Sequence, residues 1–339
     1  MRILVSDSIA EEGLNILRQE KSVEVVVNTK LKPDELKEVI KDFDALIVRS
    51  STKVTKDIIE SASNLKVIGR AGTGLDNVDA DAATKKGIIV MNTPGGNTIS
   101  TAEHTFSMIL ALSRKIPQAY VSVRKGEWDR KSFIGTELLG KVLGIIGLGR
   151  IGSEIAKRAI AFGMKLVAFD PYLSEEMAKE IEVKLVDFKE LLKISDYITV
   201  HAPLTGETKY IIGEEEFKLM KDGVRIINCA RGGIINESAL CDALKSGKAA
   251  GAALDVFEKE PPGETPLLKL ENIIATPHLG ASTEEAQVSV AVDIVKQVLD
   301  ALLGRGIRNA VNVPCIEAEL LKHIQPFINL AEKIGLLIA

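Results

Sequence analysis

The chain of 339 residues is poor in the residues that build covalent or metal frameworks. Its three cysteines, Cys229, Cys241 and Cys315, are scattered, and its four histidines lack the spacing of metal ligands. No disulfide framework and no metal site are therefore expected, and a reducing cytoplasm is the predicted compartment. No apolar run approaches the roughly 18 residues that a membrane helix needs. The first residues, MRILVSD, enter a strand directly instead of forming a signal peptide.

An excess of basic residues is also absent. The chain sets 43 Lys and Arg against 47 Asp and Glu, for a net charge of −4. Because a protein that binds duplex DNA usually carries a basic patch or stripe, nucleic acid is not an expected partner. At about 150 residues per domain, the length suggests about two domains.

Short apolar runs alternate with amphipathic segments along most of the chain. The earlier runs that predict strands are Ile3–Val5, Glu24–Val27, Ala45–Val48, Val67–Ile68 and Ile88–Val90. The later ones lie at 142–146, 166–169, 183–186, 197–200, 224–228, 250–254 and 272–275. Nearly all-apolar strands of this kind suit parallel sheets covered on both faces. The predicted class is α/β, with two doubly wound parallel-sheet domains, flavodoxin-like and Rossmann, and a cleft between them.

The run from Lys141 to Asp170, KVLGIIGLGRIGSEIAKRAIAFGMKLVAFD, has the features of a dinucleotide-binding turn. Gly147 allows the strand to turn tightly, Gly149 allows the backbone to approach a pyrophosphate, and Gly152 allows the helix to pack on the strand. The phosphates would lie at the positive end of the helix dipole. A carboxylate at Asp170 can accept hydrogen bonds from both ribose hydroxyls and repels a 2′-phosphate. The predicted cofactor is therefore NAD rather than NADP.

Domain boundaries follow from the breaks between these elements. The segment TPGGN at 93–97 is the strongest break, and a long helix is predicted from about Ser100 to Lys115. A second long helix at about 283–303 and a short strand at 311–314 would return to the first domain. The prediction is a discontinuous substrate-binding domain at 1–98 and 283–313, an NAD-binding Rossmann domain at 99–282, and a helical tail at 314–339. The tail has a predicted helix at 317–324 and ends on the apolar GLLIA, which suggests the start of a longer, regulatory region.

Polar residues follow three strands of the second domain, at the carboxyl ends where open α/β sheets carry their functional groups. Arg231 follows one strand, Asp255 and Glu260 follow the next, and His278 follows the last. Taking a hydride from a hydroxyl carbon requires a base for the hydroxyl proton and a cation for an anionic substrate. We predict that His278 is this base, Glu260 its carboxylate partner and Arg231 the cation. Any one of these three residues, taken alone, could be explained as a solvated or capping side chain.

The other histidines are interpreted as structural. His104 lies in the long helix and His201 follows a strand, and both are interpreted as structural or as supports of the site. His323 lies near the tail.

Basic residues at two strand ends of the first domain indicate the kind of substrate. Arg49 and Ser50 end one strand, and Arg70-Ala71-Gly72 end the next. Consecutive N–H groups at 71–74 can form an anion-binding nest, and the two arginines suit a phosphate. An ordinary turn with two solvated arginines is the alternative. With Arg130, in EWDRKSF, these residues suggest a substrate with more than one negative charge.

These residues resemble the D-isomer-specific 2-hydroxyacid dehydrogenases over positions 1 to about 313. The segments VRSSTKVT, GRAGTGLDNVDADAAT, GEWDRKSF, GLGRIG, NCARGG, GAALDVFEKEPP and PHLGAST occur in order. Within the family, the resemblance is closest to the enzymes that oxidise 3-phospho-D-glycerate in the first step of serine biosynthesis. It implies a homodimer formed largely by the long helix and the loop after it, and a larger homo-oligomer when a full C-terminal region is present. Regulation by serine stays open.

The resemblance also implies roles for single residues. Arg231 would bind the substrate carboxylate and carbonyl, with His278 as acid and base and Glu260 as its partner. The residues implied to contact NAD are Thr73, Gly147, Gly149, Arg150, Ile151, Gly152, Asp170, Cys229, Ala230, Asp255, His278, Leu279, Gly280 and Ala281. Those implied to bind the substrate are Arg49, Ser50, Arg70, Ala71, Gly72 and Arg130, the last across a dimer interface.

Two other functions remain open from the sequence. The same fold and mechanism could act on a smaller acid such as glycerate, hydroxypyruvate or D-lactate. The arginines Arg49, Arg70 and Arg130 argue against this, because a substrate acid whose side chain is uncharged gains nothing from them. A protein of another class, an NAD-sensing regulator resembling transcriptional corepressors, would share the fold without turnover.

Overall fold

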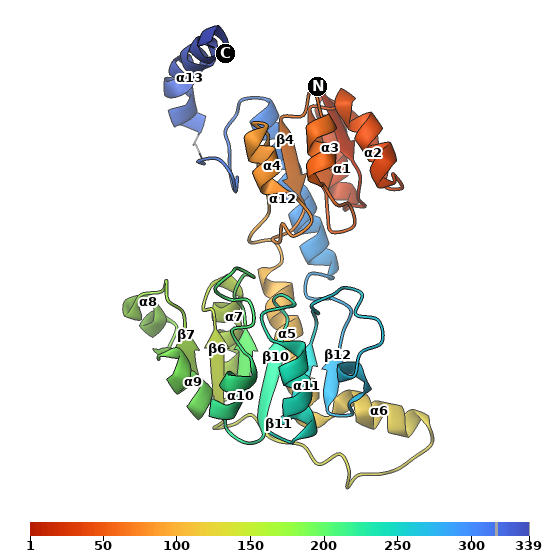
Figure 1. The fold of residues 1–339 in the computed structure, drawn as a ribbon, viewed down its shortest axis with the longest axis vertical. Helices are drawn as coiled ribbons and strands as arrows, with labels where there is room; N and C mark the ends of the chain where they lie inside the picture. The colour runs from red at the N-terminus through yellow and green to blue at the C-terminus, as the bar shows by residue number, and fades with distance from the viewer. Residues whose placement is uncertain (316–317, 339) are drawn as a thin grey trace. The chain divides into compact units, whose positions relative to one another are not determined.

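The computed structural model describes residues 1–315 and 318–338 (Figure 1). The chain divides into two compact units, Met1–Asn97 with Thr283–Ala339, and Thr98–Ser282. Each unit has one sheet, and all strand pairs within the sheets are parallel. The predicted α/β class with two doubly wound parallel sheets is confirmed.

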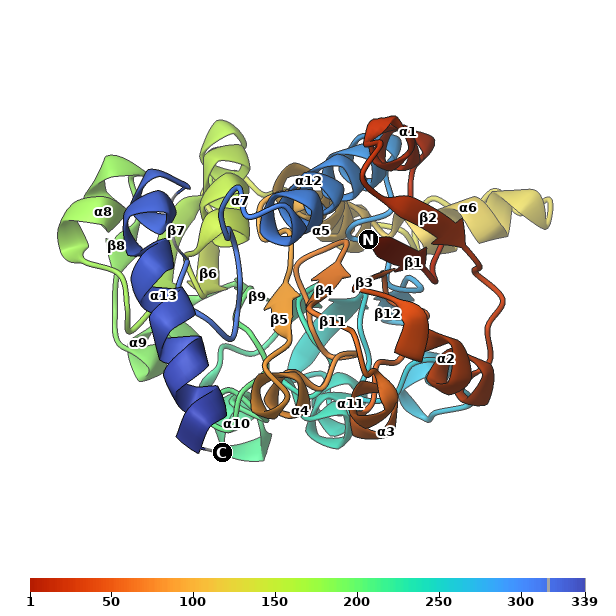
Figure 2. The ribbon, with the colours of Figure 1, turned by 90° about the horizontal axis from the view of Figure 1, so that it is seen from above.

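The first unit has a five-stranded sheet in the order β2-β1-β3-β4-β5, which is the flavodoxin-like order. Its strands are β1 (Arg2–Val5), β2 (Glu24–Val27), β3 (Ala45–Val48), β4 (Val67–Arg70) and β5 (Ile89–Met91). Its helices are α1 (Glu11–Gln19), α2 (Pro33–Val39), α3 (Lys56–Ser61), α4 (Ala80–Lys85) and α12 (Glu284–Leu302), with a 3-10 turn at Ile40–Asp42. α1 and α12 cover one face of the sheet, and α2, α3 and α4 cover the other (Figure 2).

A glycine in β4 allows α12 to lie close against this sheet. A Cβ atom at Gly69 would lie 2.5 Å from Val298 and 2.9 Å from Ile294 of α12. Both side chains are completely buried. The segment after residue 282 therefore completes the core of the first unit.

The second unit has a seven-stranded sheet in the order β12-β11-β10-β9-β6-β7-β8, a Rossmann order with one additional strand. Its strands are β6 (Val142–Ile146), β7 (Lys165–Phe169), β8 (Lys184–Leu185), β9 (Tyr197–Val200), β10 (Val224–Asn228), β11 (Ala249–Leu254) and β12 (Ile273–Ala275). Its helices are α5 (Thr98–Arg114), α6 (Ile116–Arg124), α7 (Arg150–Ala161), α8 (Glu175–Glu180), α9 (Phe188–Ile194), α10 (Glu214–Leu219) and α11 (Glu237–Lys245), with a 3-10 turn at Leu267–Lys269. α5 and α7 pack on one face, and α9, α10 and α11 on the other. The strand order reverses between β6 and β9, where open α/β sheets bind their ligands.

Two predicted elements differ in the structure. The predicted strand at 311–314 is wrong: Ala310 makes one isolated antiparallel bridge to Met91, and residues 311–314 form no strand. The reason is the side chain of Asn312, which accepts a hydrogen bond from the Val90 N–H (2.9 Å) and donates one to the Ile88 carbonyl (2.8 Å). The Asn312 side chain thus makes hydrogen bonds that the backbone of a paired strand would otherwise have made. The helix α6 was not expected; Lys115, in the left-handed conformation (φ +51°), separates it from α5.

The last helix, α13 (Ala318–Ile338), continues well beyond the predicted end at residue 324 and contains Pro326 in its interior. Glu317, where the predicted helix begins, lies outside the described residues. Among the residues that the structure describes, no helix is long and apolar enough to cross a membrane.

Candidate active site

The glycine-rich turn joins β6 to α7 at the point where the strand order reverses. Gly147 has φ +89°, and a Cβ atom there would lie 2.7 Å from the His201 carbonyl oxygen. A Cβ atom at Gly152 would lie 2.3 Å from the Gly147 carbonyl oxygen, so only glycine allows this contact between helix and turn. At Gly149, the N-cap of α7, a Cβ atom would meet no protein atom within 4 Å. The open backbone at the start of the helix fits the pyrophosphate of a dinucleotide.

Asp170, directly after β7, braces this turn. Its carboxylate accepts hydrogen bonds from the N–H groups of Leu148 (2.8 Å) and Tyr172 (2.9 Å). A carboxylate can accept about four hydrogen bonds. Asp170 can therefore hold the turn and still accept hydrogen bonds from ribose hydroxyls.

His278 and Glu260 form a hydrogen-bonded pair. The His278 Nδ1 atom lies 2.8 Å from Glu260 Oε2, and Glu260 Oε1 accepts a hydrogen bond from the Phe257 N–H (3.2 Å). Glu260 is thus held at both oxygens. Because the carboxylate occupies Nδ1, the Nε2 atom of His278 is available as the proton acceptor. The side chains of His278 and Glu260 are 49% and 39% exposed, so a substrate can reach the pair.

The turn that carries His278 is built on Asp255, whose side chain is completely buried. The Asp255 carboxylate accepts hydrogen bonds from Thr276 Oγ1 (2.6 Å), Leu279 N (2.7 Å) and Gly280 N (2.8 Å). The Asp255 carbonyl oxygen accepts a further one from His278 N (2.9 Å). Together these bonds enforce the left-handed conformation of His278 (φ +56°), which costs on the order of 1–2 kcal/mol in an L-residue.

Hydrogen bonding also keeps Asp255 ionised. Burial alone raises the pKa of its carboxyl group. Hydrogen bonds from His104, Thr276 and the Leu279 N–H outweigh this effect and hold the pKa below its usual value. Asp255 therefore acts as a fixed anion under the turn.

Asn228, at the end of β10, holds the loop of Arg231. Its Nδ2 atom donates to the Arg231 carbonyl (2.9 Å), and its Oδ1 atom accepts from Ala230 N (3.0 Å). A Cβ atom at Gly232 would lie 1.8 Å from the Phe257 carbonyl oxygen, so this loop lies directly against the segment that leads to Glu260. Since β10, β11 and β12 are neighbours, Arg231, Glu260 and His278 all come from the same edge of the sheet.

Two other groups near this edge are poor acids and bases. Burial raises the pKa of the Cys229 thiol to about 12, and burial lowers the pKa of His201 to about 3. His201 is thus a neutral imidazole, and its Nε2 atom lies 2.8 Å from Thr199 Oγ1. Neither group competes with His278 as the proton acceptor.

In the first unit, Asp7 and Asn77 support the loop that begins with Arg49. The buried Asp7 carboxylate accepts hydrogen bonds from Arg49 N (2.6 Å), Thr52 N (3.1 Å) and Thr52 Oγ1 (2.8 Å). Asn77 donates to the carbonyl oxygens of Arg49 (2.7 Å) and Thr52 (2.6 Å). Ser50, the next residue of this loop, is exposed. Asp7 lies two residues after the end of β1, so the same strand-end rule that identified Arg49 could have identified it.

The second basic strand end lies beside this loop, because β3 and β4 are paired with Val48 opposite Arg70. A Cβ atom at Gly72 would lie 1.8 Å from Arg70 Nη1, so this glycine (φ +137°) makes room for the guanidinium group. The Ala71 N–H donates to the Val48 carbonyl (2.8 Å), which removes it from the predicted anion nest. Thr73 Oγ1 lies 2.7 Å from Asn97 Oδ1.

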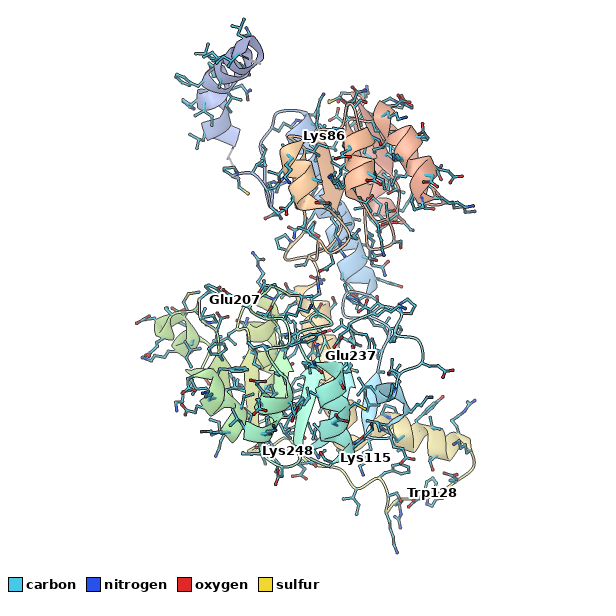
Figure 3. The ribbon with its side chains drawn as sticks, in the orientation of Figure 1. Lys86, Lys115, Trp128, Glu207, Glu237 and Lys248 are labelled. Atoms are coloured by element: carbon cyan, nitrogen blue, oxygen red, sulfur yellow. The ribbon has the colours of Figure 1, made fainter. Side chains whose placement is uncertain are left out.

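Arg130 lies away from the other predicted residues of its own unit. It is exposed in the loop after α6, and residues 132–135 of this loop line a groove with Ala250, Asn272 and Ile273 at the amino ends of β11 and β12. Glu237, at the start of α11, marks the edge of the unit where the strands end, because α11 follows β10. Trp128, in the loop of Arg130, lies at the opposite edge (Figure 3). Within one chain, the second unit therefore does not bring Arg130 to the edge that carries His278.

A Rossmann sheet with a glycine-rich turn at its switch point and a histidine–carboxylate pair at the carboxyl ends of other strands of the same sheet is typical of dinucleotide-binding oxidoreductases. Residues 106–280 match the family model described as D-isomer specific 2-hydroxyacid dehydrogenase, NAD binding domain. The chain belongs to this family, and the predicted family and NAD cofactor are confirmed.

Known proteins of this family resemble the chain over most of its length. It is 52% identical over 336 residues to the D-3-phosphoglycerate dehydrogenase of Archaeoglobus fulgidus, a match that covers 99% of the chain and 64% of that relative. A glyoxylate reductase from Paecilomyes thermophila is 32% identical with a TM-score of 0.84, and the match covers 92% of this chain and 98% of the other. D-lactate dehydrogenase from Aquifex aeolicus, in complex with NAD and lactic acid, is 31% identical with a TM-score of 0.79; here the coverage is 93% and 100%.

No metal centre emerges from the described residues. Over 1–315 and 318–338, no group of three or more His, Cys, Asp or Glu side chains is placed to hold a metal ion.

Proposed function

We propose that this chain catalyses the NAD-dependent oxidation of 3-phospho-D-glycerate to 3-phosphohydroxypyruvate, the first step of L-serine biosynthesis, in the cytoplasm. The observation that carries the proposal is the His278–Glu260 pair, 2.8 Å apart beside the loop of Arg231. The substrate is supported by sequence identity, which is 52% to a D-3-phosphoglycerate dehydrogenase but only 31–32% to the enzymes for lactate and glyoxylate. The chain spans 64% of the length of that first relative.

Each residue of the site has a distinct part in this reaction. His278 Nε2 takes the proton of the substrate hydroxyl, and Glu260 stabilises the imidazolium that forms. Arg231 fixes the substrate carboxylate with its planar, bidentate guanidinium group. NAD, when bound by the Gly147–Gly152 turn and Asp170, supplies the acceptor for the hydride. In the reverse direction, His278 returns the proton.

The forward reaction is the direct test of this activity. The chain is incubated with NAD and 3-phospho-D-glycerate, with hydrazine present to trap the oxo acid. NADH formation and the mass of the trapped product are then measured, with D-glycerate as the control substrate. We expect NADH and the phosphorylated hydrazone in equal amounts. Absence of both, with NADH binding intact, would contradict the proposal.

The substrate phosphate is proposed to bind Arg49 and Arg70, which end neighbouring strands. Arg49→Gln should raise KM for 3-phosphohydroxypyruvate by about tenfold or more and leave KM for hydroxypyruvate within about twofold. The loop should keep its shape, because Asp7 and Asn77 bind the backbone of Arg49 and not its side chain. Lys53→Gln, an exposed charge change in the same loop, is the matched control. Equal effects on both substrates would remove the phosphate assignment.

A homodimer is proposed from the apolar surface around α6. Tyr120, Trp128 and Ile134 are 62%, 81% and 75% exposed, and exposed apolar groups gathered in one region mark interaction surfaces. If a second copy packs against this surface, the exposed Arg130 would face the partner chain. This position is consistent with a role in the partner's substrate site. Analytical ultracentrifugation should give twice the chain mass of 36.6 kDa, and Trp128→Glu should shift it toward the monomer. A wild-type monomer would contradict the dimer.

A further inference from the structure

The side chain of His104 connects α5 to the turn that carries His278. Its Nε2 atom lies 3.1 Å from Asp255 Oδ1 and 3.2 Å from Thr276 Oγ1. The Thr276 hydroxyl is itself committed as a donor to Asp255 Oδ1, at 2.6 Å. Both atoms near His104 Nε2 are therefore acceptors, and the hydrogen-bond network assigns the proton to this nitrogen.

A second residue of α5 holds the far end of the same turn. Thr101 Oγ1 donates to the Gly280 carbonyl oxygen (3.1 Å). A Cβ atom at Gly280 would lie 3.3 Å from both Thr101 Cγ2 and Asp255 Oδ2, which shows how closely helix, carboxylate and turn are packed. Residues 101 and 104 lie on one face of α5, three positions apart. The helix thus contacts the turn on both sides of His278.

The conformation of His278 depends on these contacts. A residue other than glycine stays in the left-handed region only where its surroundings impose it, and His278 has φ +56°. Asp255 imposes it through hydrogen bonds to the backbone N–H groups of His278, Leu279 and Gly280 and to the Thr276 hydroxyl. A buried carboxylate that loses a donor rearranges or takes up a proton. Removal of His104 would therefore disturb the anion on which the turn is built.

We propose that His104 is a positioning residue for the reaction: through Asp255 and Thr276 it fixes the His278 turn in the geometry that pairs His278 with Glu260. His104 takes no part in proton transfer, since its Nε2 atom faces Asp255 and Thr276. Its effect is on the orientation of His278. This role goes beyond the proposed function and rests on it only for the kinetic part of its test.

The kinetic test compares His104→Leu with His104→Gln. Leucine removes the donor, whereas the glutamine amide can still donate to Asp255. We expect His104→Leu to lower kcat by about tenfold or more and to change Kd for NADH by no more than about threefold, because a displaced base slows the chemical step while the Gly147–Gly152 turn and Asp170 keep their contacts with the cofactor. His104→Gln should recover kcat to within about threefold of the wild type. Ser107→Ala, an exposed change on the same helix, is the control and should match the wild type.

A spectroscopic test needs no substrate. The chain has only four histidines, so imidazole signals in a sample labelled at histidine can be assigned, with His278→Gln identifying that of His278. We expect one sharp His278 signal in the wild type and His104→Gln, and a broadened or divided signal in His104→Leu. Tm is measured for every variant to show that it is folded.

The outcomes separate the two proposals. Wild-type kcat and an unchanged His278 signal in His104→Leu would overturn the positioning role. So would a His104→Gln variant that is as impaired as His104→Leu, because a donor at this position would then be irrelevant. If the wild type shows no dehydrogenase activity, the proposed function fails, and the His278 signal alone decides the role of His104.

Discussion

His278→Ala should lower kcat by about a thousandfold, within the range of about 10²–10⁴ that general acid–base catalysis contributes. The substrate hydroxyl would lose its proposed base, whose Nδ1 atom lies 2.8 Å from Glu260, and the oxo acid would lose its proton donor in the reverse reaction. Kd for NADH should change by much less than kcat, because His278 is only one of the residues implied to contact the cofactor, and the glycine-rich turn after β6 and Asp170 after β7 stay intact. kcat is measured with 3-phosphohydroxypyruvate, and Kd from the fluorescence of bound NADH.

The control for this variant is His323→Ala, a change at the exposed histidine of α13. It should match the wild type in kcat and in Kd. Turnover that survives in His278→Ala would remove the acid–base assignment. A loss of NADH binding together with turnover would instead show that the residue serves the fold of the turn.

Arg231→Lys should lower kcat/KM by about a hundredfold, which corresponds to about 2.7 kcal/mol of transition-state stabilisation. Lysine keeps the charge but lacks the planar fork that matches a carboxylate with two parallel hydrogen bonds. The loop itself should persist, because Asn228 binds the backbone of Ala230 and Arg231 and Gly232 fixes the contact with Phe257. Steady-state kinetics with the oxo acid measure the effect.

Arg305→Lys is the matched control, since Arg305 is a half-exposed surface arginine paired with Glu20. It should leave kcat/KM unchanged. If Arg231→Lys behaves in the same way, a point charge suffices at this position and bidentate binding of the carboxylate is wrong.

Most of the fold could be predicted from the sequence because its signals are local. Each buried strand is a short apolar run, and the close contact of Gly152 with the Gly147 carbonyl lies within the glycine motif itself. The elements that differ depend on single side chains. The Asn312 side chain makes the hydrogen bonds to the edge of β5 that another strand would have made. The left-handed backbone of Lys115 ends α5 and lets a new helix begin. Neither effect is visible in hydrophobic periodicity.

The strand-end rule singled out Arg231, Glu260 and His278 because each lies within six residues after the end of a strand. It also singled out Asp255, but not the groups that Asp255 contacts. Asp7 supports the Arg49 loop and His104 supports Asp255, and in both pairs the partners are far apart in the chain and meet only in the folded structure. The candidate residues of the site could thus be predicted from the sequence, and Asp7 was within reach of the same rule. The contacts that these supporting residues make could not be predicted.

The central claim is tested most directly by NADH oxidation with 3-phosphohydroxypyruvate, hydroxypyruvate and pyruvate side by side. The arginines at the ends of β3 and β4 predict that kcat/KM for the phosphorylated acid exceeds that for either other acid by about a hundredfold or more, near 2.7 kcal/mol. Equal values for the three acids would contradict a phosphoglycerate enzyme and indicate a broad 2-hydroxyacid dehydrogenase. Bound NADH with no turnover of any acid would contradict catalysis itself.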